Sequence, residues 1–203
     1  MTKKSIITTL RKLSKRHPTR KGFNSAVGKM FPKIGEGAFR KVYDAGEYVI
    51  KLRHTWHDGM YYDKEEIDSG NRIEMNVYRQ IAKHAPSVAY FVLKPIHVKF
   101  PNDHDAILMP KVETEMTADE DLLEYDEDGN SDILDHFTPK MKLQYKFIDK
   151  AFKDGGDSNM GWDMKKERVW YLDLNYEGYA DARDLFCCRA VAKRRATALL
   201  KKL

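Results

Sequence analysis

The residues that decide the fold run Ile34-Gly35-Glu36-Gly37-Ala38-Phe39-Arg40-Lys41-Val42 and, after a short interval, Tyr48-Val49-Ile50-Lys51-Leu52. In the first stretch two glycines interrupt residues that suit a strand, so the pattern predicts a strand, a glycine turn and a second strand. The intervening Asp44-Ala45-Gly46-Glu47 has the composition of a hairpin turn and predicts that the second stretch is a third strand. Residues 31–52 are therefore expected to begin a β-rich region.

The third of these strands divides its side chains between two faces. In an alternating strand, Tyr48, Ile50 and Leu52 share one face, and Val49 and Lys51 share the other. If Ile50 faces the core, Lys51 lies beneath the glycine turn, where an ammonium can reach phosphate oxygens and Val49 can pack on an adenine ring. Glycines suit such a site because their backbone N–H groups approach phosphates closely. The alternatives are an ordinary hairpin turn and an exposed strand lysine.

Residues 64–83 are expected to form a helix, because Ile73, Val77 and Ile81 recur at every fourth position and form one apolar stripe. Glu74 lies beside this stripe, at the margin of the predicted buried face. A carboxylate at that position can orient the lysine of the third strand. The alternative is one more solvated helix glutamate.

The other predicted elements follow from periodicity and from punctuation by proline and glycine. We expect helices at 6–13 and from Pro139 onward, strands at 88–98, 106–109 and 169–172, and a helix-compatible tail from Asp181. With 203 residues, the chain is long enough for one globular unit or for two small lobes sharing a cleft. The predicted fold class is α+β.

A second polar cluster follows the helix that Pro139 opens. Asp154 and Asn159 bracket a glycine-rich loop, and Asp173 ends the apolar strand that comes next. Phosphoryl transfer requires a carboxylate that orients the acceptor hydroxyl, and oxygen ligands that hold Mg²⁺ against the phosphates. Asp154 suits the first task, and Asn159 and Asp173 suit the second. Turn and cap chemistry is the alternative for each aspartate.

In this order and spacing, the chain resembles the eukaryotic-type protein kinases. The segments that carry the resemblance, over about residues 31–180, are Gly35 to Val42 (the Gly-rich loop), Val49-Ile50-Lys51, Glu74, Asp154 to Asn159 (the catalytic loop) and Asp173-Leu174-Asn175. The resemblance implies a two-lobe fold with a β-rich N-lobe and a reduced helical C-lobe. The implied segments are a basic extension (1–30), the N-lobe (31–112), an acidic connection (113–138) and the C-lobe with a basic terminal helix (139–203).

The resemblance also implies roles for individual residues. Asp154, Lys51 and Glu74 would be catalytic, and Asn159 and Asp173 would bind Mg²⁺ or Mn²⁺. The implied ATP site consists of Gly35, Gly37, Val42, Val49, Lys51, Met109 and Val112. Residues 107–112 would be the hinge between the lobes, with adenine contacts from backbone atoms around Met109 to Val112.

Several positions depart from the kinase pattern. Arg40 replaces the third glycine of the loop, and Phe152-Lys153 precedes the catalytic aspartate in place of His-Arg. Gly156 stands where a lysine is usual, and Leu174-Asn175 replaces Phe-Gly. The chain also ends at Leu203, too soon for an ordinary activation segment and a full helical lobe. It therefore looks more like the reduced kinase-like proteins of phages and bacteria.

Charge is distributed unevenly along the chain, whose net charge is +5. Residues 1–21 and the C-terminal tail are basic, and residues 113–135 contain no Lys or Arg. Basic ends suit non-specific contact with nucleic acid, docking on the acidic stretch or simple solvation. No apolar run is long enough to cross a membrane and no signal peptide is evident, so a cytoplasmic protein is expected, in the host cytoplasm if it is phage-encoded.

The cysteines and histidines give little sign of a metal site. Cys187 and Cys188 are sequence neighbours and are expected to be reduced thiols. His54 and His57 lack the second ligand pair that a zinc site needs.

The function expected from these residues is ATP- and Mg-dependent transfer of the γ-phosphoryl group to a Ser or Thr hydroxyl of a protein substrate, or to a small-molecule hydroxyl. The alternative from the departures above is a pseudokinase or nucleotide-regulated binding protein, in association with nucleic acid through its basic ends.

Overall fold

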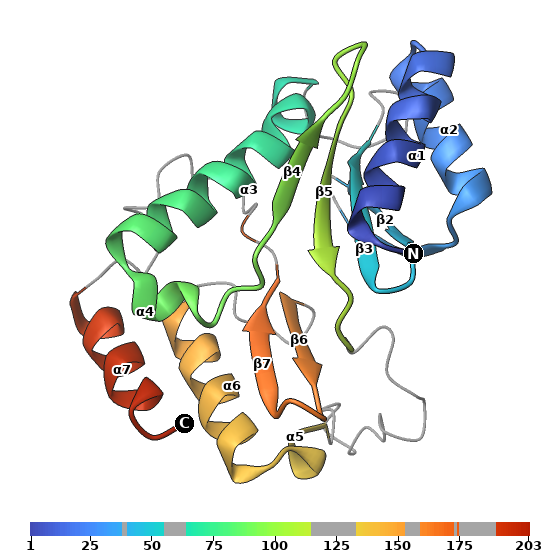
Figure 1. The fold of residues 1–203 in the computed structure, drawn as a ribbon. Helices are drawn as coiled ribbons and strands as arrows, with labels where there is room; N and C mark the ends of the chain where they lie inside the picture. The colour runs from blue at the N-terminus through green and yellow to red at the C-terminus, as the bar shows by residue number, and fades with distance from the viewer. Residues whose placement is uncertain (38–39, 55–63, 115–132, 153–158, 173, 175–189) are drawn as a thin grey trace. The chain divides into compact units, whose positions relative to one another are not determined.

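The structure is a computed structural model with an α+β fold (Figure 1). It describes the chain apart from residues 38–39, 55–63, 115–132, 153–158, 173 and 175–189. The chain forms two compact units. The first combines Met1–Met75 with Lys94–Lys111, and the second combines Asn76–Leu93 with Val112–Leu203. Among the described helices, none has the length and apolar character that crossing a bilayer requires.

The first unit contains a five-stranded antiparallel sheet. Its strands are β1 (Lys33–Glu36), β2 (Arg40–Asp44), β3 (Tyr48–Arg53), β4 (Ile96–Lys99) and β5 (Asp105–Pro110), in the order β1-β2-β3-β5-β4. The three strands predicted within residues 31–52 are all present. At the turn between β2 and β3, Gly46 has a φ of 85°, a left-handed conformation that glycine adopts without steric cost.

Two helices cover one face of this sheet, α1 (Lys3–Arg16) and α2 (Arg20–Met30). The predicted helix at 6–13 is confirmed and is longer than expected, whereas α2 was not predicted. Thr19 caps the start of α2 by accepting a hydrogen bond from the Gly22 N–H. Residues 1–30, which the sequence set apart as a basic extension, thus pack in the first unit as two helices.

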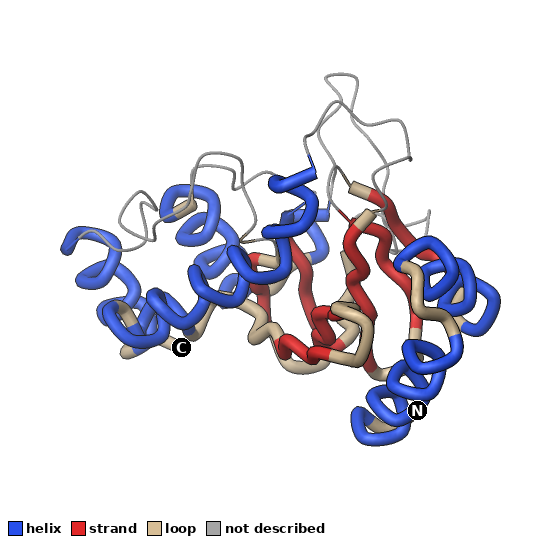
Figure 2. The backbone as a smooth tube through the Cα atoms, turned by 90° about the horizontal axis from the view of Figure 1, so that it is seen from above, coloured by secondary structure: helices blue, strands red, loops and turns tan. Residues whose placement is uncertain are grey.

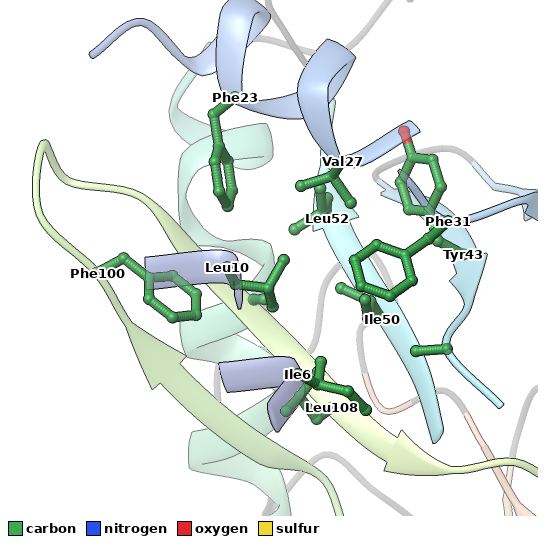
Figure 3. Close-up of a cluster of buried hydrophobic side chains, with 12 residues drawn as sticks. Ile6, Leu10, Phe23, Val27, Phe31, Tyr43, Ile50, Leu52, Phe100 and Leu108 are labelled. Carbon is green, nitrogen blue, oxygen red and sulfur yellow. The ribbon is translucent and has the colours of Figure 1, made fainter. Parts of the chain in front are cut away.

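The core of the first unit lies between these helices and the sheet. Figure 3 shows Ile6 and Leu10 of α1 and Phe23 of α2 facing Ile50 and Leu52 of β3. All five side chains are at most 1 % exposed, and burying such a side chain stabilises the fold by roughly 1.5–3 kcal/mol. Ile50 thus faces the core, which was the condition for placing Val49 and Lys51 on the opposite face.

The opposite face of the sheet lies toward the first part of α3 (Lys64–His84), which carries Glu74. Figure 2 shows the start of this helix on one side of the strands and the helices beside the N-terminus on the other. Residues 64–75 of α3 belong to the first unit. The predicted helix is confirmed and ends one residue beyond the predicted boundary.

The second unit consists mainly of helices around a small hairpin. Its elements after α3 are α4 (Pro86–Ala89), α5 (Ile133–His136), α6 (Pro139–Ala151), β6 (Met160–Asp163), β7 (Arg168–Tyr171) and α7 (Ala190–Leu200). The helix predicted from Pro139 and the strand predicted near 169–172 are confirmed.

The predicted strand over 88–98 is wrong from residue 88 to residue 95. Pro86 occupies the first turn of α4, where its fixed φ favours a helix. Val88 is buried in that short helix, and strand pairing with β5 begins only at Ile96.

One buried side chain fixes the hairpin of β6 and β7. Gln144, fully buried on α6, donates from Nε2 to the carbonyl oxygen of Glu167 at 2.9 Å. Its Oε1 accepts from the Val169 N–H at 3.2 Å. A buried amide that satisfies a strand edge in this way specifies how the hairpin packs on the helix.

Candidate functional site

Four residues of the predicted ATP site share one face of the five-stranded sheet. Val42 pairs with Lys51, and Val49 pairs with Met109. Partners in an antiparallel pair project to the same side, and Val49 and Lys51 are two residues apart on one strand. This is the face opposite Ile50 and Leu52, so the register brings together a lysine and three apolar side chains.

Lys51 and Glu74 form an ion pair on this face. The distance from Lys51 Nζ to Glu74 Oε1 is 3.5 Å, and the two side chains are 10 % and 0 % exposed. Glu74 is more buried than its predicted position at the margin of the helix stripe, because α3 turns it toward the sheet and leaves Ile73 only partly buried. A glutamate on α3 therefore holds the ammonium of the β3 lysine at a fixed place.

Arg40 is a third member of this cluster that the sequence did not reveal as a site residue. Its Nη1 contacts Glu74 Oε2, and its side chain is 5 % exposed. Glu74 thus receives one cation on each carboxylate oxygen, Lys51 on Oε1 and Arg40 on Oε2. The one signal in the sequence was the departure itself, a long cationic side chain where the Gly-rich loop of kinases has its third glycine.

His54 contacts the backbone of the glycine turn. A ring nitrogen of His54, Nε2, lies 2.8 Å from the Gly37 carbonyl oxygen, and the Gly37 N–H donates to the Arg40 carbonyl at 2.9 Å. A Cβ added to Gly37 would meet no atom within 4 Å. Packing inside the chain therefore does not require a glycine at this position.

Glu36, the last residue of β1, forms ion pairs with neighbouring lysines. Lys33 Nζ donates to Glu36 Oε2 at 2.6 Å, and Lys41 Nζ is 3.6 Å from Oε1. The hydrogen bond from Lys33 and the charge of Lys41 hold the pKa of Glu36 below its usual value, although burial opposes this shift. The negative charge of Glu36 is therefore paired with Lys33 and Lys41.

A second polar cluster lies on the same face of the sheet. Asp105 on β5 is 2.7 Å from Arg53 Nη2 through Oδ1 and 2.7 Å from His97 Nε2 through Oδ2. Burial alone would raise the pKa of Asp105, but the hydrogen bond from His97 and the charge of Arg53 hold this pKa below its usual value. This cluster, too, was not predicted from the sequence.

The predicted hinge residues fall in both units. Met109 is 1 % exposed on β5, whereas Val112 belongs to the second unit. There its Cγ2 would lie 2.5 Å from a Cβ placed on Gly161, so Val112 packs closely on β6. Within the described residues, β4 pairs only with the part of β5 that ends at Leu108. No described strand therefore covers the outer backbone edge of Met109.

Of the residues predicted in the catalytic loop and for metal binding, the structure describes Asn159. Its carbonyl oxygen accepts from the Leu172 N–H at 2.8 Å, next to the pair formed by Met160 and Tyr171. Asp154 and Asp173 lie outside the described residues, as do His57, Cys187 and Cys188. In the described ranges, no group of three or more His, Cys, Asp or Glu side chains gathers as a metal site.

Comparisons with known proteins do not show a family for this chain. No family model and no curated protein matches it. Among solved structures it is similar to "PpkA-294 apo form", with 14 % sequence identity and a TM-score of 0.39. The match covers 84 % of this chain, which spans 60 % of the length of the other. A likeness at this level carries no argument about chemistry.

Proposed function

We propose that the chain is a protein-kinase-like phosphotransferase that transfers the γ-phosphoryl group of ATP, with Mg²⁺, to a Ser or Thr hydroxyl of a protein substrate. The observation that carries the proposal is the buried pair of Lys51 on β3 and Glu74 on α3, on the sheet face that Lys51 shares with its pairing partner Val42. A kinase-like arrangement with a nucleotide cleft is part of the proposal.

The sheet face offers complementary chemistry to a nucleotide. Lys51 would contact the phosphates, and Glu74 would hold its ammonium in place so that little side-chain freedom is lost on binding. Val42 and Val49, both partly buried, would supply an apolar surface for the adenine ring. The open space at Gly37 supports close approach of the turn to phosphate oxygens, because no atom of the described chain fills it.

The second unit would supply the remaining groups. Asn159 and Asp173 would bind Mg²⁺ through oxygen atoms, and the metal would offset phosphate charge. Support comes from the strand pairing, since Asn159 bonds to Leu172, the residue directly before Asp173. Asp154 would accept the proton of the acceptor hydroxyl while the hydroxyl oxygen forms a bond to the γ-phosphorus. The bond between the γ-phosphorus and the β–γ bridging oxygen would break, which releases ADP.

The test is phosphoryl transfer by purified protein. Incubation with γ-labelled ATP and Mg²⁺ or Mn²⁺ should label the chain or an added generic Ser/Thr protein substrate such as casein. Lys51→Met and Asp154→Asn should both abolish labelling, while Asp154→Asn should keep the rise in melting temperature that Mg-ATP causes in the wild type. Transfer at the wild-type rate by Asp154→Asn would refute the role of this residue.

The Arg40–Glu74 contact favours a second candidate, a nucleotide-regulated binding protein without transferase activity. Because Arg40 holds Glu74 independently of Lys51, α3 can stay docked on the sheet whether or not the lysine engages phosphate. For this candidate, Mg-ATP should raise the melting temperature of the wild type, but no label should appear on any protein. Stoichiometric autophosphorylation would exclude it.

A further inference from the structure

The solvent side of α1 carries a stripe of cations. Lys4, Arg11, Lys12 and Lys15 are all exposed and recur at intervals that keep them on one side of the helix. The opposite side holds Ile6, which is buried against the sheet. From Lys4 to Lys15 the stripe is about 16 Å long, at 1.5 Å of rise per residue.

The stripe is part of a region that contains basic residues and no acidic ones. No Asp or Glu occurs before Glu36 in the chain. The exposed cations of α1 and α2 are Lys3, Lys4, Arg11, Lys12, Lys15, Arg16, Lys21 and Lys29. None of the four residues in the stripe makes an ion pair with another described residue. Their side chains are therefore available to an external anion.

The length of the stripe indicates which kind of anion it can bind. A single phosphate or carboxylate would engage one or two of these side chains, whereas a duplex carries one negative charge per about 1.7 Å of its axis. A stripe of this length can face several phosphates at once. We propose that the α1 stripe is a sequence-independent binding surface for the phosphate backbone of nucleic acid.

The packing of α1 argues against a membrane surface as the partner. Helices that lie on membranes bury an apolar face in the lipid. The apolar face of α1 is already used, because Ile6 and Leu10 are fully buried in the core. The large apolar side chains left exposed at the ends of the two-helix segment are Met1 and Met30. The four stripe residues thus offer charge without an apolar surface for insertion.

The stripe and the candidate ATP site lie on opposite sides of the first unit. α1 packs on the face of Ile50 and Leu52, and Lys51 projects from the other face. Occupation of one surface therefore leaves the other accessible. The nucleic-acid surface does not depend on the proposed transferase activity and can be tested separately.

The test measures binding of the full chain to a fluorescent DNA duplex of mixed sequence between about 50 and about 200 mM NaCl. The stripe variant carries Lys4→Gln, Arg11→Gln, Lys12→Gln and Lys15→Gln. If all four residues contact phosphates, the slope of log K against log salt should become shallower by about 3.6. The matched control neutralises four exposed lysines elsewhere, with Lys83→Gln, Lys94→Gln, Lys146→Gln and Lys150→Gln, and should keep the wild-type slope.

The proposal would be overturned by no wild-type binding at about 50 mM salt, by an unchanged slope in the stripe variant, or by an equal change in the control. Binding to vesicles of phosphatidylcholine and phosphatidylserine but not to the duplex would also overturn it. The stripe variant should retain the wild-type circular dichroism spectrum, because the changed side chains are exposed, and should keep any melting shift that Mg-ATP causes in the wild type.

Discussion

Arg40 and Glu74 are 34 residues apart in the sequence and meet in the interior of the first unit. The contact joins β2 to α3 beside the Lys51–Glu74 pair. One buried carboxylate thereby connects two adjacent strands and a helix. Glu74 has two cationic partners, one on each carboxylate oxygen. Loss of Glu74 therefore removes both ion pairs, whereas loss of either cation removes only one.

Glu74→Gln should destabilise the protein more than Lys51→Met. The glutamine removes the charge that both cations contact, and breaking a buried ion pair costs about 3–5 kcal/mol. Lys51→Met leaves Arg40 on Glu74 and replaces a buried ammonium by an apolar side chain of similar length, so its cost should be smaller. Urea denaturation of the two variants measures the difference, and equal losses would contradict the shared carboxylate.

Lys51 should matter more than Arg40 for the affinity of the protein for Mg-ATP. Lys51→Met should weaken Mg-ATP binding by about 10–100-fold, because a hydrogen bond to a charged group is worth about 1.5–3 kcal/mol. Arg40→Gln should weaken it much less, since Arg40 acts through Glu74 in the proposed site. Isothermal titration calorimetry gives both values. A larger loss for Arg40→Gln would assign the phosphate contact to the arginine.

Gly37→Ala should leave stability nearly unchanged and reduce Mg-ATP affinity. The added methyl group meets no atom within 4 Å, so the free energy of unfolding should change by less than about 0.5 kcal/mol. Gly46→Ala is the control. With a φ of 85° and Met1 N 3.1 Å from the new Cβ, it should cost about 1–2 kcal/mol without affecting affinity. Unchanged ATP affinity in Gly37→Ala would remove this glycine from the site.

His104 should make stability depend on pH near neutrality. It is 4 % exposed and stacks on Phe23 at 4.5 Å between ring centroids. Burial and the charge of Arg20 hold its pKa below the usual 6.5. The folded chain therefore binds this proton less readily than the unfolded chain. The contribution of neutral His104 is complete above pH 6.5 and is lost as the pH falls through the lowered pKa.

Denaturation midpoints measured over this pH range test the assignment. His104→Phe and His104→Gln should both reduce the fall of the denaturation midpoint as the pH decreases below 6.5. His136→Gln, at an exposed position, should retain it. A slope that survives His104→Gln would assign the pH dependence to other groups.

Gln144→Leu should destabilise the second unit by about 1–3 kcal/mol, because it leaves the buried Val169 N–H and the partly buried Glu167 carbonyl without their side-chain partner. Hydrogen exchange at the Val169 amide should accelerate by a corresponding factor. Leu143→Ala, at a 48 % exposed position of the same helix, should change stability by less than about 0.5 kcal/mol. Equal exchange rates in the two variants would contradict the anchoring role of Gln144.

Local patterns account for what the sequence predicted correctly. The strands around Lys51 follow from hairpin turns and two-residue alternation, and α3 follows from its four-residue repeat. By contrast, α2 has only Phe23 and Val27 as buried apolar residues, too few to show a stripe. The apolar residues between Val88 and Leu93 fit a strand or a helix equally, and Pro86 decides the outcome.

The site shows the same division. The Lys51–Glu74 pair was one of two alternatives from the sequence, because each residue lies on an element with a clear pattern, and the resemblance to protein kinases implied the pairing. The ion pairs of Arg40 and Asp105 were not predicted, because no local pattern in the sequence marks them. No periodicity in the sequence distinguishes a buried arginine on β2 from an exposed one.

The order of strands in the first sheet has a consequence for synthesis. The chain leaves the first unit at Met75 and returns at Lys94, and the returning β5 lies between β3 and β4. Phe100, Ala106 and Leu108 are part of the first core. A ribosome that has released only the first 75 residues therefore exposes an incomplete hydrophobic layer until the returning segment emerges. A fragment cut at Met75 should aggregate, and neither unit should be obtainable as one continuous piece of the gene.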